Sequence, residues 1–328
     1  MQNLVLTFNI IAPLLCYMLL GAFLRHVGIV TEDFRNRMNK LLVKAFVPVS
    51  VFNSLSTADL SSVSDMGYIL YALFANMLFF FLMIAVCGRF IKDPARRGSF
   101  IQGSTRGNGV IFGIPLAIAV FGEAGALEMA LMLALLVPYY NTFEVVMIEI
   151  CGEKARMLRE GGQSAENGKV KVDYKKIGKS LLTNGILWGV FLGLMFNFLQ
   201  LRLPPFLITV TKGIGGCVSP VAFMMAGAAF SFKAAGANRK LLSLAIAIKL
   251  VILPTIFLIL PVIWGYTDKI LLCMLVAFAV PTAIVSYPMA KAAGCDGDLA
   301  AEIVAFTTAL SMFTMFLWIF LFKSMGML

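Results

Sequence analysis

The feature that most constrains this chain is an apolar stretch, Gly103 to Gly122, that is poorly suited to a continuous helix (GSTRGNGVIFGIPLAIAVFG). The residues that oppose a helix are Gly103, Gly107, Gly109, Gly113 and Pro115. Inside a helix, glycine costs about 1 kcal/mol relative to alanine, and proline costs about 3 kcal/mol. A membrane tolerates such a defect only where the freed backbone groups are buried in protein or line a wet cavity. The stretch therefore predicts a broken membrane helix, with the polar Asn108 beside the break as a candidate site residue.

The composition places this stretch in a membrane protein. Of the 328 residues, 60% are hydrophobic and 13% are charged, whereas soluble domains carry about 25% charged residues. We therefore expect a polytopic, all-α membrane protein and exclude a water-soluble core. The net charge of +10 does not indicate a nucleic-acid partner, because the basic residues lie between apolar runs.

Ten apolar segments have the length of about 20 residues that a membrane-spanning helix needs. We expect them near residues 4–24, 38–56, 67–88, 100–121, 126–149, 177–199, 205–231, 241–264, 270–291 and 299–322. Of the 27 Lys and Arg residues, 20 fall in alternate connections and only three in the others. The positive-inside rule then predicts that both termini are extracytoplasmic and that the polar loop 151–176 is cytoplasmic. The expected location is the lipid bilayer of the cell membrane.

An internal repeat crosses this loop. Ala45–Phe52 (AFVPVSVF) resembles Cys217–Met224 (CVSPVAFM), and Gly21 in the first span corresponds to Gly193 in the sixth at the same offset. Because each half of the chain contains five spans, an odd number, the second half must enter the membrane from the opposite side. Inverted repeats of this kind are typical of secondary transporters.

The repeat supplies the broken fourth span with a partner in the ninth. The segment Val280–Pro288 (VPTAIVSYP) contains Pro281 and Pro288, and each proline removes a backbone donor. In transporter folds, substrate binds near the membrane midplane where broken helices meet, and the free N–H groups of such helices favour an anion. The side chains that would add hydrogen bonds are Asn108, Thr282 and Ser286. One proline would more often be a simple kink, but a duplicated pair beside glycine and polar residues favours a site.

Ionisable residues within the expected spans are candidates for function because they are costly in a membrane. They are Lys44, Arg106, Glu144, Lys212 and Lys249. Arg106 either attracts an organic anion or extends to the cytoplasmic interface, whereas Glu144, one turn after Asn141, is a candidate proton or cation site. The sequence has no HExxH, GxSxG or phosphate-loop motif, and its one histidine and six cysteines indicate no metal site. We expect neither an enzyme nor a cofactor.

The segments around the two breaks resemble those of a known family. Asn108–Pro115 (NGVIFGIP) looks like the N-x-x-x-x-G-[IL]-P segment of the auxin efflux carrier family, which includes plant PIN carriers and bacterial malate and malonate permeases. Pro281–Val285, followed by Ala290 and Lys291, resembles the family's second crossover segment. Pro138–Glu149 (PYYNTFEVVMIE) resembles the end of its fifth span. The similarity extends over nearly the whole chain, without the long loop of plant carriers.

The resemblance implies two inverted five-helix repeats, 1–150 and 177–328, joined by the cytoplasmic linker 151–176. The fourth and ninth helices would cross. Spans 1, 2, 6 and 7 would form a scaffold, against which a transport domain of spans 3–5 and 8–10 moves like an elevator. The implied substrate is a small organic carboxylate anion, such as malate, malonate or an auxin-like acid, that contacts Asn108.

The candidate substrate-binding residues are Arg106, Asn108, Gly109, Pro115, Asn141, Thr282, Ala283 and Ser286. The expected helix breaks are at Gly113, Pro115, Pro281 and Pro288. Glu144 is the candidate for ion coupling, with a proton and a sodium ion both left open, and a homodimer is left open as well. A receptor or sensor would normally carry a cytoplasmic output domain, for which the linker is too short. A channel would show a continuous polar stripe, whereas the polar residues here are isolated at the two crossings.

Overall fold

A computed structural model describes residues 2–56, 66–159, 182–183, 185–229 and 239–328. All regular elements in these ranges are helices, and the single β-type pairing there is an isolated antiparallel bridge between Gly107 and Thr282. Six helices are long and apolar enough to cross a membrane, and two shorter apolar helices accompany them, Gly109–Gly122 and Gly185–Phe198. The predicted class, an all-α membrane protein, is confirmed.

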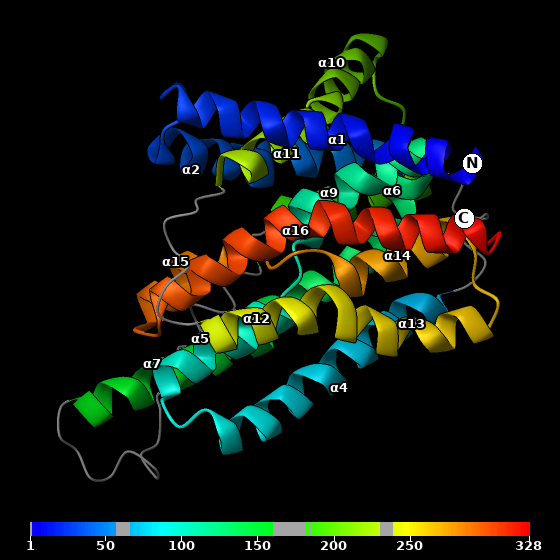
Figure 1. The fold of residues 1–328 in the computed structure, drawn as a ribbon. Helices are drawn as coiled ribbons and strands as arrows, with labels where there is room; N and C mark the ends of the chain where they lie inside the picture. Colours follow the sequence, from blue (N-terminus) through cyan, green and yellow to red (C-terminus); the bar gives the residue numbers. More distant parts are fainter. Residues whose placement is uncertain (1, 57–65, 160–181, 184, 230–238) are drawn as a thin grey trace.

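The first half of the chain contains long helices, some of which run through several consecutive elements (Figure 1). Its elements are α1 (Gln2–His26), α2 (Glu32–Leu41), the π-helix η1 (Leu42–Phe46), α3 (Val47–Ser56), α4 (Gly67–Phe90), α5 (Pro94–Thr105), the π-helix η3 (Gly109–Gly113), α6 (Ile114–Tyr139), the π-helix η4 (Tyr140–Glu144) and α7 (Val145–Arg159). α6 bends sharply at Gly122, whose φ of 63° and ψ of −148° are not helical.

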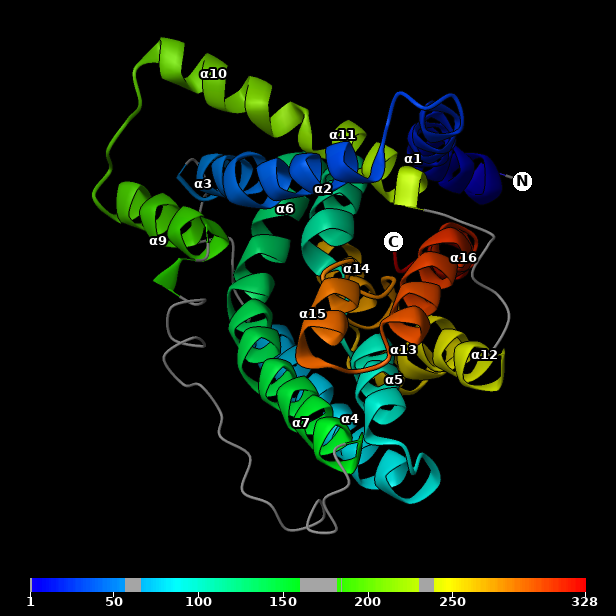
Figure 2. The same cartoon turned by 90° about the vertical axis from the view of Figure 1, so that its left-hand side faces the viewer.

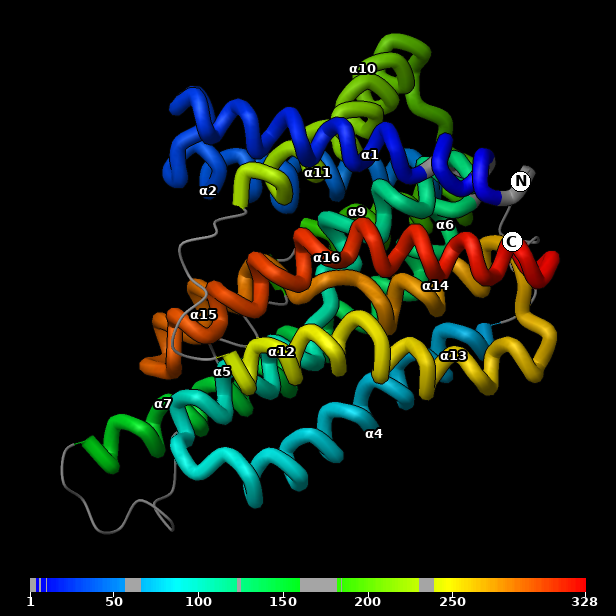
Figure 3. Tube along the Cα trace, in the orientation of Figure 1, coloured from blue at the N-terminus to red at the C-terminus, as the bar shows by residue number. Residues whose placement is uncertain are grey.

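The second half repeats this pattern of long and interrupted helices. Its elements are α9 (Gly185–Phe198), α10 (Pro205–Gly216), α11 (Val218–Ala229), α12 (Arg239–Ala247), the π-helix η6 (Ile248–Ile252), α13 (Leu253–Ile263), α14 (Asp268–Ala279), α15 (Ser286–Ala293) and α16 (Gly297–Ser324). Figures 1 and 3 show both termini at one end of the molecule, and the α1–α2, α4–α5 and α15–α16 turns at the other. The basic turns of the sequence therefore share one end.

The helices form two groups with α6 between them (Figure 2). In the first group, α1 packs along α11 and α3 packs along α9. The second group contains α4, α5, α7 and α12–α16, and α6 contacts members of both groups, namely α3, α11, α4 and α14. The interrupted helices η3–α6 and α14–α15 therefore meet where the two groups face each other.

Within the first group, the paired helices approach each other closely at glycine residues. A Cβ atom at Gly21 would overlap the backbone carbonyl oxygen of Met224, and one at Gly193 would meet Leu55 and the carbonyl oxygen of Phe52. Gly21 and Gly193 occupy equivalent positions of the internal repeat, and so do Met224 and Phe52. The α1–α11 and α3–α9 pairs are thus packed through corresponding residues.

Proline accounts for three of the π-helices. Pro48, Pro115 and Pro254 each lie two residues after a π-helix ends. A proline ring clashes with the carbonyl group four residues earlier, and a wider π-turn at that point moves the carbonyl group away. The helix can then continue through the proline. The expectation that Gly113 and Pro115 break the fourth span is therefore wrong, because Gly113 lies in η3 and Pro115 in the first turn of α6.

The actual breaks are shorter than predicted. The first covers residues 106–108, between α5 and η3, and the second covers residues 280–285, between α14 and α15. Pro288 does not break the helix, because it lies in the first turn of α15, where the backbone needs no N–H donor. Two helix ends also differ from those expected. α5 begins at Pro94, where the Asp93 side chain caps it, and α7 continues to Arg159, into the expected linker. The rest of that linker lies outside the described residues.

Candidate functional site

The two breaks cross and hold each other through their backbones. The amide of Asn108 donates a hydrogen bond to the carbonyl oxygen of Pro281 at 2.8 Å, and the amide of Ala283 donates to the carbonyl oxygen of Arg106 at 3.0 Å. Thr282 ties the second break to neighbouring helices, since its hydroxyl donates to the carbonyl oxygen of Gly103 at 2.5 Å and its amide donates to Thr307 Oγ1 at 3.1 Å. These backbone groups of the two breaks are thus satisfied within the protein, as a membrane requires.

A cavity of about 150 Å³ lies beside this crossing. Its polar lining comes from Arg106, Asn108 and Asn141 of the first half, and Ala283 lines it from the second break. Val43 of η1 and Ile186 of α9 close it from the opposite helix group. The cavity therefore lies between the crossing and the α1–α3 and α9–α11 group.

Arg106 is held inside the protein. Its side chain is 8% exposed, its Nη2 donates to Asn141 Oδ1 at 2.7 Å, and its Nη1 donates to the carbonyl oxygen of Tyr140 at 3.0 Å. The guanidinium carbon also lies 5.7 Å from the centre of the Tyr140 ring. Of the two interpretations of Arg106, this buried position beside the cavity favours a role at the site over extension to the cytoplasmic interface.

Two further buried charges lie behind Arg106. Glu144 Oε2 is 3.9 Å from Arg106 Nη1, and Glu144 Oε1 accepts a hydrogen bond from Thr105 Oγ1 at 2.9 Å. Lys249 of η6 is fully buried, and its Nζ donates to the carbonyl oxygen of Thr105 at 3.3 Å. The cluster contains two cations and one carboxylate, so it carries a formal charge of +1 next to the cavity. A net positive charge in a low-dielectric region favours an anion.

Several predicted site residues have other contacts. The Thr282 hydroxyl is used by its bond to Gly103, Gly109 packs against Leu133, and the Pro115 carbonyl oxygen accepts from Ser219 at 3.4 Å. Ser286 is buried at the start of α15 and does not line the cavity. The crossing thus brings together Arg106, Asn108, Asn141 and Ala283 around the cavity, whereas Gly109, Pro115, Thr282 and Ser286 do not line it.

The other ionisable candidates differ in how deeply they are buried. Lys44 and Lys212 are exposed, whereas Lys249 is buried beside the crossing. Sequence reasoning missed Glu128, which is 3% exposed, accepts from the Tyr68 hydroxyl at 2.7 Å and lies 3.8 Å from Lys269 Nζ. The sequence signal that could have identified Glu128 was a carboxylate inside an apolar run. Glu128 joins α4, α6 and α14 and does not line the cavity at the crossing.

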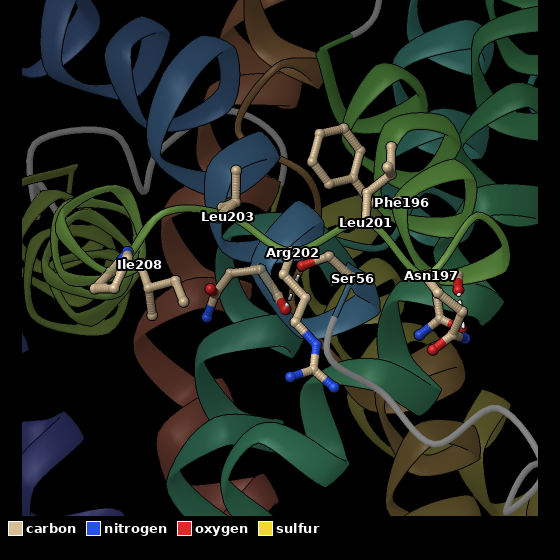
Figure 4. A pocket seen from close by; sticks show the side chains of 10 residues that line it. Ser56, Phe196, Asn197, Leu201, Arg202, Leu203 and Ile208 are labelled. Atoms are coloured by element: carbon tan, nitrogen blue, oxygen red, sulfur yellow. Dashed lines mark hydrogen bonds between the residues drawn. The ribbon is translucent and has the colours of Figure 1, made fainter.

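A larger cavity of about 540 Å³ lies among α3, α9 and α10. Figure 4 shows Ser56, Asn197 and Arg202 among the side chains that line it. All of its lining residues belong to the α1–α3 and α9–α11 group or its connections, and none belongs to the crossing. The smaller cavity therefore remains the candidate site.

Comparison with known proteins finds a family and a relative that cover nearly the whole chain. Residues 6–319 match the model of a family described as membrane transport protein. The chain belongs to this family. It is also similar to an uncharacterized transporter of Methanothermobacter thermautotrophicus, with 22% identity over 317 residues that cover 94% of this chain and 96% of the relative. The resemblance to the auxin efflux carrier family is confirmed.

As a member of the membrane transport protein family, the chain is a multi-pass membrane transporter for a small-molecule substrate. In the part of the chain that the structure describes, no three His, Cys, Asp or Glu side chains lie close enough together to hold a metal ion.

Proposed function

We propose that this transporter moves a small organic carboxylate anion across the cell membrane and binds it in the cavity at the crossing. The observation that carries the proposal is that the Arg106 guanidinium shares this cavity with the amide side chains of Asn108 and Asn141. A guanidinium and neighbouring amide donors match the oxygens of a carboxylate. The start of η3, directly after Asn108, adds free backbone N–H groups with a partial positive charge.

The size of the cavity supports a small acid. Pockets for drug-sized ligands measure roughly 300–1,000 Å³, whereas this cavity measures about 150 Å³. Acids of the size of malate, malonate or lactate are the substrates that we propose, with an auxin-like acid as the larger variant.

The mechanism that we propose is an elevator movement between two inverted repeats of five helices. The corresponding contacts Gly21–Met224 and Gly193–Phe52 support a two-fold relation between the halves. They lie within the α1–α3 and α9–α11 group, the proposed scaffold. The group that carries the crossing, α4–α7 and α12–α16, is the proposed transport domain. Both termini are proposed to be extracytoplasmic, because the basic turns share the opposite end.

Glu144 is the proposed coupling group, for a proton or a sodium ion. Its carboxylate lies 3.9 Å from Arg106, so a change in its charge would alter the field that the bound anion feels. The competing role is structural, as the counter-charge of Arg106 and Lys249.

Transport by purified protein in liposomes tests the proposal. We expect labelled malate, malonate, lactate or indole acetate to accumulate under an imposed proton, sodium or counter-substrate gradient, and liposomes without protein to show no uptake. If none of these acids moves under any gradient, the proposed substrate class is wrong. Single-channel currents in planar bilayers would contradict an elevator.

A further inference from the structure

A second cleft, of about 560 Å³, lies away from the crossing between α4, α5 and the η4–α7 segment. Its walls are mainly apolar, with Phe80, Phe81, Ile84, Phe143 and Met147 among the lining residues. Arg97 and Lys154 line it as well, and no acidic residue does. An apolar cleft with two cations is suited to an anion that carries a hydrocarbon chain.

The two cations have no carboxylate partner among the described residues. The ion pairs at this end of the molecule use neighbouring side chains instead: Arg96 lies 3.5 Å from Asp296, and Arg156 lies 2.6 Å from Glu153. Arg97 lies in the first half of α5, and Lys154 lies in the second half of α7. Both are near the end of the molecule that carries the basic turns, where lipid headgroups of the inner leaflet would lie.

We propose that this cleft binds one anionic phospholipid of the inner leaflet. Its phosphate lies between Arg97 and Lys154, and one acyl chain packs against the apolar wall. A small free anion would satisfy the cations but would leave the apolar wall without a partner, whereas a zwitterionic lipid would bring its own cation to the two basic side chains. Basic pockets between membrane helices on the cytoplasmic side have the chemistry that anionic headgroups need.

The bound lipid would contact the back of the candidate functional site. Thr142 and Phe143 of η4 line the cleft, and they stand between Asn141 and Glu144, which both contact Arg106. The same π-turn therefore presents one face to the lipid and the other to the crossing. An acyl chain against Phe143 would restrict movement of this turn.

Native mass spectrometry of the full chain in detergent tests the proposal, with phosphatidylglycerol or phosphatidylcholine added. We expect one retained phosphatidylglycerol and a preference of more than about tenfold over phosphatidylcholine, because each cation near an anionic lipid contributes a factor of about five. The variant Arg97→Gln/Lys154→Gln should lose this preference. Arg89→Gln/Lys92→Gln is the matched control, since both residues are exposed, lie at the same end and do not line the cleft. Equal retention of the two lipids by the unaltered protein overturns the proposal.

A second variant tests the place of the acyl chain. A Cβ atom at Gly88, which lines the cleft, would meet open space. Gly88→Leu should therefore fold normally, fill part of the cleft and weaken lipid retention about tenfold or more. Gly213→Leu on α10, where a Cβ atom also meets open space, should leave retention unchanged. If Gly88→Leu retains lipid like the unaltered protein, the acyl chain does not lie in this cleft and the proposal is wrong.

The same protein also serves to test whether the bound anion is a lipid headgroup or free phosphate. Inorganic phosphate should give no increase in melting temperature at concentrations where phosphatidylglycerol does. If inorganic phosphate alone stabilises the protein through Arg97 and Lys154, the cleft is a free-anion site and the lipid proposal is wrong. None of these measurements requires transport, so their failure is distinct from failure of the proposed function.

Discussion

The backbone amide of Asn108 donates a 2.8 Å hydrogen bond to the carbonyl oxygen of Pro281, and this bond joins breaks from the two halves of the chain. Pro281 has no N–H group to return the bond, so the second bond comes from Ala283 to the carbonyl oxygen of Arg106. The crossing is therefore held by main-chain atoms. The Asn108 side chain is left to line the cavity.

Asn108→Ala should weaken anion binding and leave the fold almost unchanged. Loss of a hydrogen bond to a charged group costs about 1.5–3 kcal/mol, which corresponds to a loss of affinity of more than about tenfold. The bond to Pro281 uses the backbone and survives the substitution. Binding is measured from the melting-temperature increase that a panel of carboxylates produces. Asn108 would be structural if the variant lost most of its folded protein while the remainder bound with unchanged affinity.

Thr282→Val should show the opposite behaviour. It removes the hydroxyl that donates to the Gly103 carbonyl oxygen at 2.5 Å in a buried position. Leaving that acceptor without a partner should cost about 1–3 kcal/mol of unfolding free energy. Because the Thr282 side chain does not line the cavity, affinity in the folded fraction should be unchanged. Thermal unfolding in detergent, together with the same ligand panel, separates the two effects, and a selective loss of affinity would place Thr282 in the binding site.

The broken helices were predictable from sequence, because glycine and proline act locally. Gly107 and Pro281 lie in the observed breaks, and Asn108 lines the cavity beside them. The same local rule failed at Gly113 and Pro115. There the π-helix η3 accommodates the proline, and a choice between a break and a π-turn depends on neighbours that a sequence pattern does not contain.

The charge cluster was only partly predictable. The position of Arg106, Glu144 and Lys249 inside expected spans marked each as a candidate. Their grouping, however, depends on how η4 and η6 pack against α5. Glu128 was missed because it lies only two residues inside the expected span 126–149, where the end of a span and a connecting loop are hard to tell apart. Its contacts with Tyr68 and Lys269 come from two other helices.

Gly21→Ala should destabilise the α1–α11 contact. The added Cβ would overlap the backbone carbonyl oxygen of Met224, and overpacking of this kind costs about 1–3 kcal/mol. Gly213→Ala on α10 is the matched control, because its Cβ meets open space and alanine has the higher helix propensity. The melting temperature should therefore fall in Gly21→Ala and rise in Gly213→Ala, relative to the unaltered protein. Equal stability of the two variants would show that α1 and α11 accommodate the added methyl group without a loss of unfolding free energy.

Glu144→Gln should be strongly destabilising. The substitution removes the carboxylate that faces Arg106 at 3.9 Å and that also acts electrostatically on the buried Lys249. Breaking a buried ion pair by removing one partner costs about 3–5 kcal/mol. Glu153→Gln, which breaks the more exposed 2.6 Å pair with Arg156, should cost less than about 1 kcal/mol. Thermal unfolding in detergent measures both.

A second substitution distinguishes charge from packing at Glu144. Lys249→Met keeps an unbranched side chain of similar length and removes one of the two buried cations, so Glu144→Gln/Lys249→Met should regain part of the stability lost in Glu144→Gln. The interaction between the two sites should be at least about 1 kcal/mol in a double-mutant cycle. Additive effects would mean that Glu144 and Lys249 act independently. In that case the Thr105 bonds, and not the opposed charges, would hold the cluster behind Arg106.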